Sequence, residues 1–365
     1  MTKKIAVFLP NLTGGGAEKI SINLIRDMVV NSDLQIDLVL GKAEGIFLND
    51  IPSGVNLVDF NSDRIYKTIF PLVKYLRSNE PFSLLVHISH TNVVALIAKR
   101  LSRTSTKVYV VEHNNLQAKE GTSFLKKVVL RPLMRWLYPS AERVIGVSVG
   151  VSESVKSQLR LAGSNVTTIY NPVVMPEVIQ KSLLTADHPW FTDDSLPVFL
   201  GVGSLTEQKD FENLLEAFAL MLKRFPARLI ILGDGPLRGD LERKVVELNI
   251  EDLVSLPGFT DNPYSFMSKA NCFVLSSRYE GLPTVLIEAM ACGCNVISTD
   301  CPSGPNEILE NGRLGKLVPI EDHHSLAKAM METLVSPSST KELKQRASTF
   351  TPENVVPKYV SLLTR

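Results

Sequence analysis

The chain alternates between short apolar runs and longer segments in which apolar residues recur at helical spacing. The short runs are rich in Val, Ile and Leu, which is typical of parallel strands that helices bury on both faces. The pattern predicts strands at Ile5–Leu9, Ile36–Leu40, Leu84–Ile88, Val108–Val111 and Val144–Val147 in the first half, and at Val198–Val202, Ala227–Leu232, Val254–Leu256, Cys272–Leu275 and Asn295–Ser298 in the second.

The predicted strands form two groups, separated by a stretch without periodicity. Prolines and polar residues accumulate there, from about Asn171 to Pro197, as they do in connections between domains. The length of 365 residues also exceeds that of one ordinary domain and fits two. We therefore predict an α/β protein with two Rossmann-like, doubly wound domains that face each other across a cleft, at residues 1–180 and 190–351.

Composition places the chain among globular proteins and excludes other classes. A hydrophobic fraction of 44% and a charged fraction of 21% provide enough apolar surface to fold. The four cysteines all lie in the second half and have no His at zinc-ligand spacing, so neither a metal site nor a disulfide framework is expected. Ile5–Leu9 is too short for the apolar core of a signal peptide, and no run is long enough for a transmembrane helix.

Charge is distributed unevenly between the two halves. Residues 1–180 carry 21 Lys and Arg against 14 Asp and Glu, a net charge of +7, whereas residues 181–365 carry 18 against 24, a net charge of −6. A basic first half suits an anionic acceptor or an anionic membrane surface. No nucleic-acid partner is expected, because proteins that bind nucleic acid carry a stronger and more clustered positive excess.

Two candidate features of the first half follow predicted strands. Gly14, Gly15 and Gly16 separate the first strand from a helical segment, so backbone N–H groups there can approach a phosphate. The loop lacks the G-x-G-x-x-G fingerprint, which disfavours a nicotinamide dehydrogenase, and a turn that serves only the local geometry also explains it. His113 follows another strand, at the sheet edge where open α/β folds bind ligands, and a purely structural histidine is compatible with the same position.

Two loops of the second half also contain candidate residues. Lys209 follows the strand that ends near Gly203 and can donate a charge-assisted hydrogen bond to a diphosphate, unless it is only a solvated loop lysine. Glu280 lies in the turn after the strand that ends at Leu275, and Glu288 lies eight positions later, in the helix that follows. This spacing lets Glu280 meet sugar hydroxyls, the helix start meet phosphate and Glu288 hold ribose hydroxyls.

Glu280 and Glu288 match the Glu-x7-Glu motif of glycosyltransferase family 4, and the chain resembles that family over nearly its whole length. The resemblance is dense from Gly201 to Glu307 and patchier in the first half, at Gly14–Glu18 and His113. It implies the GT-B fold, with a last helix at about 352–365 that packs back on the first domain.

The resemblance also implies roles for individual residues. His113, Lys209 and Glu280 are expected to be catalytic, with Lys209 on the donor diphosphate and the other two around the transferred sugar. The expected binding residues for the nucleotide sugar are Gly15, Gly16, Ser204, Lys209, Phe259, Arg278, Gly281, Leu282, Pro283, Thr284 and Glu288. Ser204 departs from the family pattern, in which many members have Arg, so Arg278 or Arg238 is expected to supply the second cation.

A retaining hexosyltransferase or N-acetylhexosaminyltransferase is the activity that the resemblance implies, with front-face attack and no metal or other cofactor. The expected donor is a UDP-sugar. The expected acceptor is a glycan, in particular a polyprenyl-diphosphate-linked glycan of cell-surface polysaccharide or glycoprotein assembly. A sugar-nucleotide epimerase on the same fold and a non-catalytic sugar-nucleotide-binding subunit remain as alternatives.

Two segments that mix basic and apolar residues, Phe124–Tyr138 and Arg64–Arg77, bear on the location of the protein. Such segments can lie on anionic lipid, which predicts a cytoplasmic protein with peripheral contact to the inner face of the cytoplasmic membrane. Ordinary packed helices with solvated lysines explain the same segments.

Overall fold

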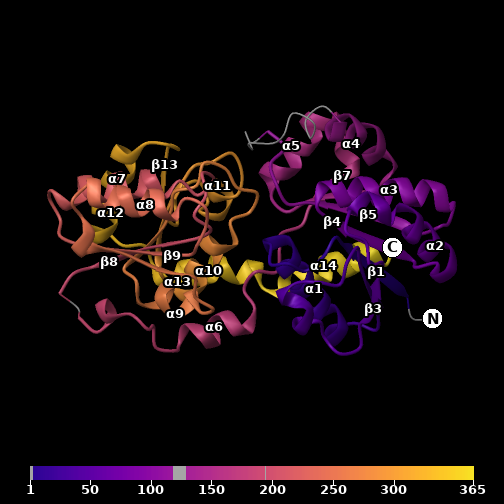
Figure 1. The fold of residues 1–365 in the computed structure, drawn as a ribbon, viewed down its shortest axis with the longest axis horizontal. Coiled ribbons are helices and arrows are strands. Elements are labelled where there is room, and N and C mark those ends of the chain that lie inside the picture. Colours follow the sequence, from indigo (N-terminus) through magenta and orange to yellow (C-terminus); the bar gives the residue numbers. More distant parts are fainter. Residues whose placement is uncertain (1–2, 118–128, 194) are drawn as a thin grey trace. The chain divides into compact units, whose positions relative to one another are not determined.

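The computed structural model describes residues 3–117, 129–193 and 195–365, and the chain divides into two compact units (Figure 1). The first unit comprises Met1–Pro172 and Pro352–Arg365, and the second comprises Val173–Thr351. Each unit is built on one parallel sheet.

The sheet of the first unit has seven described strands in the order β3-β2-β1-β4-β5-β6-β7, and all neighbours are parallel. The strand order reverses between β1 and β4, and the loops after these strands open at the sheet edge where open α/β folds bind ligands. The strands are Lys4–Leu9 (β1), Gln35–Leu40 (β2), Asn56–Asp59 (β3), Ser83–His87 (β4), Lys107–Glu112 (β5), Arg143–Gly146 (β6) and Val166–Thr168 (β7).

Helices connect the strands of the first unit and cover its sheet. Because helices shield both faces, the central strands β1, β4 and β5 are buried along almost their whole length. The helices are Gly16–Asn31 (α1), Ile69–Asn79 (α2), Ser89–Ser102 (α3), Arg131–Leu137 (α4), Val149–Leu159 (α5) and Pro352–Leu363 (α14), with short 3₁₀ turns at Ile46–Asp50, Ile65–Thr68, Tyr138–Ser140 and Gly163–Asn165.

Helix α14 comes from the end of the chain and packs against α1 in the first unit. Its residues Tyr359 and Leu363 are buried. Two strand residues donate hydrogen bonds to its last turn, Ser83 Oγ to the carbonyl of Leu363 at 2.5 Å and Tyr109 Oη to the carbonyl of Leu362 at 2.9 Å. The last helix therefore forms part of the hydrophobic core of the first unit.

The second unit repeats the same topology with six described strands, in the order β10-β9-β8-β11-β12-β13. All neighbours are again parallel, and the strand order reverses between β8 and β11. The strands are Val198–Val202 (β8), Arg228–Leu232 (β9), Val254–Gly258 (β10), Cys272–Leu275 (β11), Asn295–Thr299 (β12) and Lys316–Val318 (β13).

Helix α7 shows how the sequence builds the core of the second unit. Its apolar residues Phe211, Leu214, Leu215, Phe218 and Met221 recur every three or four positions, and all are buried in one cluster with strand residues and α12. The helices of this unit are Pro176–Ser182 (α6), Phe211–Leu222 (α7), Arg238–Glu247 (α8), Pro263–Lys269 (α9), Thr284–Cys292 (α10), Pro305–Ile308 (α11), His323–Val335 (α12) and Thr340–Ala347 (α13), with 3₁₀ turns at Pro189–Phe191, Glu251–Leu253 and Ser348–Phe350.

All ten predicted strands are present, and the prediction of two doubly wound α/β domains is confirmed. The strands that the pattern missed, β3, β7 and β13, have three or four residues and lie at sheet edges, where less burial removes the apolar run. The second unit begins at Val173, before the expected end of the first domain at 180, because α6 packs against α9 and α10.

Tyr359→Ala is expected to lower the free energy of unfolding by about 3–5 kcal/mol, because it leaves a cavity beneath α14. Tyr359 is 1% exposed, whereas Tyr66 in the same unit is 55% exposed. The control Tyr66→Ala should therefore change the free energy of unfolding by less than about 0.5 kcal/mol. Urea unfolding followed by circular dichroism measures both, and equal effects would contradict an integral role for α14.

Candidate functional site

Two loops of the second unit meet where its strand order reverses. Lys209 follows β8 and Glu280 follows β11, and the carboxyl ends of these neighbouring parallel strands open at the same edge. Lys209 Nζ lies 2.6 Å from Glu280 Oε1, and the two side chains are 18% and 9% exposed. Ser277 Oγ donates to the same carboxylate oxygen at 2.8 Å. The edge therefore carries a largely desolvated, charge-assisted ion pair.

Further hydrogen bonds join the two loops beside this ion pair. The Arg278 backbone N–H donates to the carbonyl of Gln208 at 2.8 Å, and Gln208 Nε2 donates to the carbonyl of Tyr279 at 3.0 Å. Ser276 Oγ donates to the carbonyl of Lys209 at 2.7 Å. These bonds hold both loops in one arrangement, so Lys209 and Glu280 are preorganised by their backbone.

Arg278, an expected donor-binding residue, is engaged by acidic partners. Its Nη2 donates to Asp210 Oδ1 at 3.1 Å, and its Nε lies 3.0 Å from Asp210 Oδ2 and 3.3 Å from Glu321 Oε1. Asp210 is buried at the start of α7, so releasing Arg278 to a phosphate would leave a buried carboxylate without its cation. Arg238 is also engaged, by Glu242 Oε1 at 2.9 Å and the carbonyl of Leu256 at 2.8 Å.

The turn Gly281–Pro283 connects Glu280 to helix α10, and all three of its residues are buried. The loop before α11 supports it, because Ser303 Oγ donates to the carbonyl of Glu280 at 2.7 Å. Gly304 packs directly on the turn with φ +96°, and a Cβ there would lie 2.4 Å from Pro283 Cδ. The turn is therefore fixed from beneath by a position that accepts only glycine.

Helix α10 begins at Thr284 and carries Glu288 in its second turn. Glu288 is buried, and its Oε1 lies 3.4 Å from Tyr264 Oη, a long hydrogen bond that leaves the carboxylate weakly held by this hydroxyl. Glu280 and Glu288 thus lie on either side of the helix start, as their spacing predicts.

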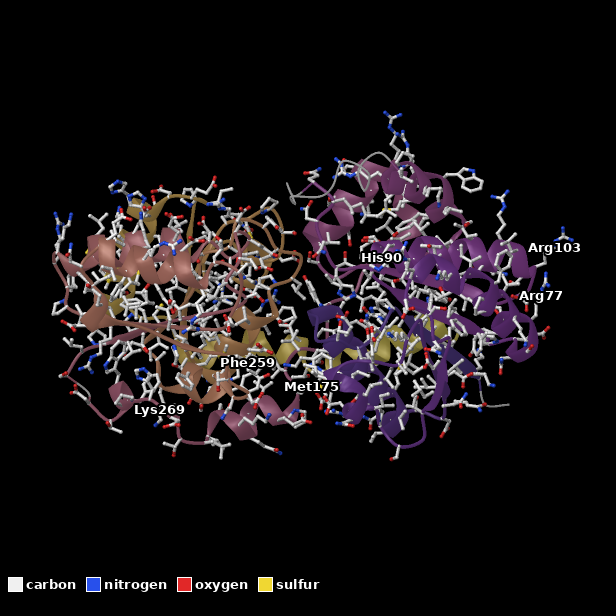
Figure 2. The ribbon with its side chains drawn as sticks, in the orientation of Figure 1. Arg77, His90, Arg103, Met175, Phe259 and Lys269 are labelled. Carbon is white, nitrogen blue, oxygen red and sulfur yellow. The ribbon has the colours of Figure 1, made fainter. Side chains whose placement is uncertain are left out.

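Two further expected binding residues follow strands of the same sheet. Ser204 is exposed in the loop after β8, and the stem of Lys209 packs over the preceding residue, since a Cβ on Gly203 would lie 3.2 Å from Lys209 Cε. Phe259 is exposed directly after β10 (Figure 2). Both come from carboxyl ends of strands, the edge that also carries Lys209 and Glu280.

In the first unit, Gly15 and Gly16 form the start of α1, with Gly15 extended at the N-cap. Glu18 in the first helical turn folds back over this start, because a Cβ on Gly15 would lie 2.1 Å from Glu18 Oε2. A carboxylate there already interacts favourably with the helix dipole. A phosphate at this position would have to displace Glu18.

His113 follows β5 and contacts a second histidine that sequence patterns did not single out. His87 Nδ1 lies 2.9 Å from His113 Nε2, and the ring planes differ by 30°. His87 is completely buried, whereas His113 is partly exposed. Burial lowers the pKa of His113 to about 4 and lowers the pKa of His87 well below its usual value, so both imidazoles are neutral at pH 7.

A buried carboxylate holds the two strand ends that carry these histidines. Glu112 accepts hydrogen bonds from Ser89 Oγ at 2.7 Å and Asn92 Nδ2 at 2.9 Å, and also from Tyr138 Oη. Between His87 and α3, Ile88 has φ +75°, a conformation that costs a β-branched residue roughly 1–3 kcal/mol. Glu112 therefore ties the strained β4–α3 junction to the end of β5.

The four cysteines of the second unit are free thiols. Burial raises the pKa of Cys292 and of Cys301 to about 12, so neither forms a reactive thiolate at neutral pH.

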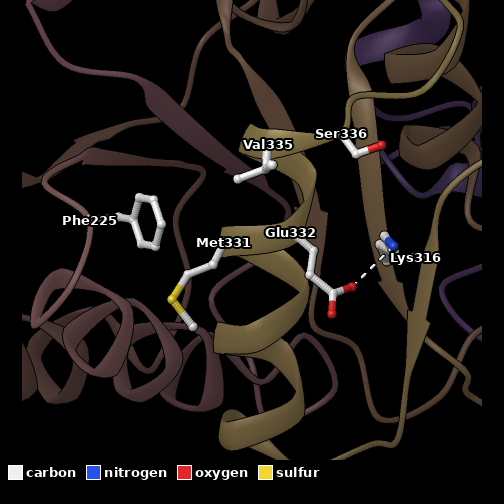
Figure 3. A pocket seen from close by; sticks show the side chains of 6 residues that line it. All are labelled: Phe225, Lys316, Met331, Glu332, Val335 and Ser336. Carbon is white, nitrogen blue, oxygen red and sulfur yellow. Dashed lines mark ion pairs between the residues drawn. The ribbon is translucent and has the colours of Figure 1, made fainter.

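A hollow of about 330 Å³ lies elsewhere on the second unit (Figure 3). Its lining includes the end of α12 and the start of β13, where Lys316 Nζ and Glu332 Oε2 are 3.1 Å apart. The start of a parallel strand lies at the amino edge of the sheet, opposite the edge that binds ligands in such folds. The lining residues are Phe225, Lys316, Met331, Glu332, Val335 and Ser336, none of which was predicted to bind a ligand.

Comparison with known proteins identifies the family. The family described as Glycosyltransferase Family 4 matches residues 14–175, and the one described as Glycosyl transferases group 1 matches residues 186–350. The chain belongs to glycosyltransferase family 4. The two matches fall on the two structural units, so both halves of this glycosyltransferase agree with the family.

Two proteins that are similar to this family 4 glycosyltransferase come from Campylobacter jejuni. One, named N-acetylgalactosamine-N,N'-diacetylbacillosaminyl-diphospho-undecaprenol 4-alpha-N-acetylgalactosaminyltransferase, is 26% identical over 95% of this chain and 94% of its own length. The other, named GalNAc-alpha-(1->4)-GalNAc-alpha-(1->3)-diNAcBac-PP-undecaprenol alpha-1,4-N-acetyl-D-galactosaminyltransferase, is 26% identical over 99% of this chain and 98% of its own length.

Among solved structures, Anabaena Alr3699/HepE in complex with UDP has a TM-score of 0.79, with 20% identity and 100% of both chains covered. This likeness confirms the GT-B fold that the resemblance implied.

Several residues that support the site were not predicted from the sequence. His87 had a signal, because it is the second-last residue of the predicted strand Leu84–Ile88 and the last residue of β4. Ser277 and Ser303 had none, since serines in loops are common and their partners depend on how distant loops pack.

Gly304→Ala is expected to destabilise the glycosyltransferase by about 1–3 kcal/mol, because the added Cβ strains the backbone and clashes with Pro283. Gly239→Ala is the control in the same unit, where the Cβ would meet only Arg243 Nη1 at 3.6 Å. Chemical unfolding gives the stability, and amide hydrogen exchange at residues 280–284 should rise only in Gly304→Ala. Unchanged exchange there would show that Gly304 does not support the turn.

Proposed function

We propose that this chain is a retaining glycosyltransferase that transfers a hexose or N-acetylhexosamine from a UDP-sugar to a polyprenyl-diphosphate-linked glycan. The Lys209–Glu280 pair is the observation that carries the proposal, because it joins a cation for a diphosphate to a carboxylate for sugar hydroxyls at the ligand-binding edge. The names of both Campylobacter jejuni relatives support an undecaprenol-linked acceptor, and the UDP bound to the Anabaena protein supports the nucleotide.

Lys209 can hold Glu280 and a donor phosphate together, since an ammonium group has three N–H donors. The start of α10 adds a helix dipole that favours phosphate oxygens, and Glu288 in the same helix accepts from the ribose hydroxyls. In the first unit, Gly15 and Gly16 at the start of α1 would be able to bind a phosphate once Glu18 moves aside. Phe259 would lie near the base, with Ser204 in the diphosphate loop.

The chemical step requires the UDP leaving group to depart with its developing negative charge stabilised. Lys209 is held in place before the reaction, so it stabilises that charge without the cost of reorganisation. Glu280 Oε1 is occupied by Lys209 and Ser277, which makes this carboxylate a poor nucleophile and suits it to orienting the sugar. The acceptor hydroxyl would attack the anomeric carbon on the face from which UDP leaves and pass its proton to the leaving phosphate oxygen. The anomeric configuration would thereby be retained. The step needs no metal ion or other cofactor.

An epimerase or a non-catalytic subunit would use the same donor contacts. Neither is favoured, because the relatives that match nearly the whole chain are named as transferases. An epimerase would convert the donor to its epimer without an acceptor, and a binding subunit would bind UDP without turnover.

A lipid-linked acceptor would put the reaction at the inner face of the cytoplasmic membrane, so peripheral contact with that membrane is part of the proposal. Among the described residues, no helix is long and apolar enough to cross a membrane. The segment 64–77 packs its apolar side inward but exposes Phe70. Its Arg77, labelled in Figure 2, donates to the carbonyl of Leu101 at 3.0 Å, near the end of α3. Residues 124–128 of the other segment lie outside the described residues. Within α4, Trp136 is 61% exposed, with Arg100 Cζ 4.8 Å from its ring centroid.

Glu280→Gln is expected to lower kcat about 100-fold, because the neutral amide holds neither Lys209 nor the sugar hydroxyls as the carboxylate does. Glu280→Gln leaves the Lys209 ammonium largely buried without its partner, which could itself cause misfolding. The double variant Lys209→Met with Glu280→Gln removes both charges and checks for this effect. Lys269→Ala, an exposed lysine in the same unit, serves as the control. Release of UDP with a lipid-linked acceptor measures kcat, and nuclear magnetic resonance of the product reads the anomeric configuration.

Either of two results would contradict this account of the reaction. Full activity in Glu280→Gln would remove Glu280 from the site, and a covalent glycosyl-enzyme trapped in the wild type would exclude front-face attack.

The double variant Phe70→Asp with Trp136→Asp is expected to weaken binding to anionic vesicles about tenfold or more, because each aspartate removes an apolar contact and adds repulsion. Val335→Asp, at an exposed apolar position of the second unit, should leave vesicle binding unchanged. Sedimentation with phosphatidylglycerol-containing vesicles measures the partition. Equal loss in the control would show that the two aromatic residues do not form the membrane contact.

A further inference from the structure

Only one proton can lie between His87 Nδ1 and His113 Nε2. Both imidazoles are neutral, and the 2.9 Å separation of His87 Nδ1 and His113 Nε2 is that of a hydrogen bond. A neutral imidazole carries its proton on one nitrogen and accepts on the other. Either His87 donates from Nδ1, or His113 donates from Nε2.

The surroundings of His87 distinguish the two arrangements. Its other nitrogen, Nε2, is buried and has no hydrogen-bond partner among the described residues. If His113 donated, the proton of His87 would lie on Nε2 as a buried N–H without an acceptor, and such orphaned donors are rare. If His87 donates from Nδ1, Nε2 is a bare buried nitrogen and no N–H is left unpaired.

We propose that His87 is a positioning residue, which donates its Nδ1–H to His113 Nε2 and thereby holds His113 as the Nδ1-protonated tautomer. The junction that carries His87 is suited to this role, because Glu112 fixes Ser89 and Asn92 against the end of β5, next to His113. The two rings are therefore held by the backbone as well as by the hydrogen bond between them.

The tautomer decides what His113 offers to a bound sugar. With its proton on Nδ1 and its Nε2 lone pair accepting from His87, His113 can donate to a sugar oxygen but has no free lone pair with which to take a proton. His113 is thus a hydrogen-bond donor and not a general base. This consequence rests on the proposed function, whereas the tautomer itself does not.

The test uses the full-length protein labelled with ¹⁵N-histidine at pH 7.5. Long-range correlation of ring nitrogens with carbon-bound ring protons distinguishes a protonated nitrogen from a bare one, and loss of one pattern in His113→Gln assigns the His113 signals. The proposal predicts a protonated Nδ1 and an unprotonated Nε2 on His113. A proton on Nε2, or on both nitrogens, would overturn it, even in a protein without transferase activity.

Two substitutions of His87 separate hydrogen bonding from packing. His87→Asn keeps an amide N–H near the place of Nδ1, and His87→Leu removes the donor. We expect His87→Leu to lower kcat roughly tenfold with little change in donor KM, and His87→Asn to restore most of it. His90→Leu, three residues away and exposed, is the control. Equal losses in His87→Asn and His87→Leu would show that His87 acts by packing alone.

Discussion

The proposed site of this glycosyltransferase depends on the ion pair between Lys209 and Glu280. Two neighbouring parallel strands, β8 and β11, end at the point where the strand order reverses, and each delivers one member of the pair. A charge so little exposed is costly unless it is paired and hydrogen-bonded, so either residue alone would destabilise its loop. Ser277 and the hydrogen bonds between the loops complete the arrangement.

In the first unit, neutral groups lie at the corresponding position of the sheet. Its strand order also reverses between β1 and β4, and the residues gathered at that edge are a glycine loop and two imidazoles. Here burial keeps His87 and His113 uncharged. In the second unit, Lys209 and Glu280 form an ion pair instead. The strand ends of the second unit therefore carry a paired cation and carboxylate, whereas those of the first unit carry neutral imidazoles.

Much of the fold could be predicted from the sequence, for a definite reason. Central strands such as β1 and β9 are buried on both faces and therefore show as apolar runs, whereas the short edge strand β3 has mostly exposed residues and no such signal. The proximity of Lys209 and Glu280 could also be predicted, because both residues follow predicted strands and the Glu-x7-Glu spacing identifies the second loop. The contacts of Arg278 with Asp210 and of Gly15 with Glu18 could not be predicted, because they depend on the conformation of the folded backbone.

The central claim is that Lys209 and Glu280 together hold one activated sugar. A crystal structure of the protein with a bound UDP-sugar tests it most directly. The account predicts Lys209 Nζ within hydrogen-bond distance of a diphosphate oxygen and the Glu280 carboxylate within hydrogen-bond distance of a hydroxyl of the same sugar. A UDP-sugar bound elsewhere, with neither residue in contact with it, would contradict the account.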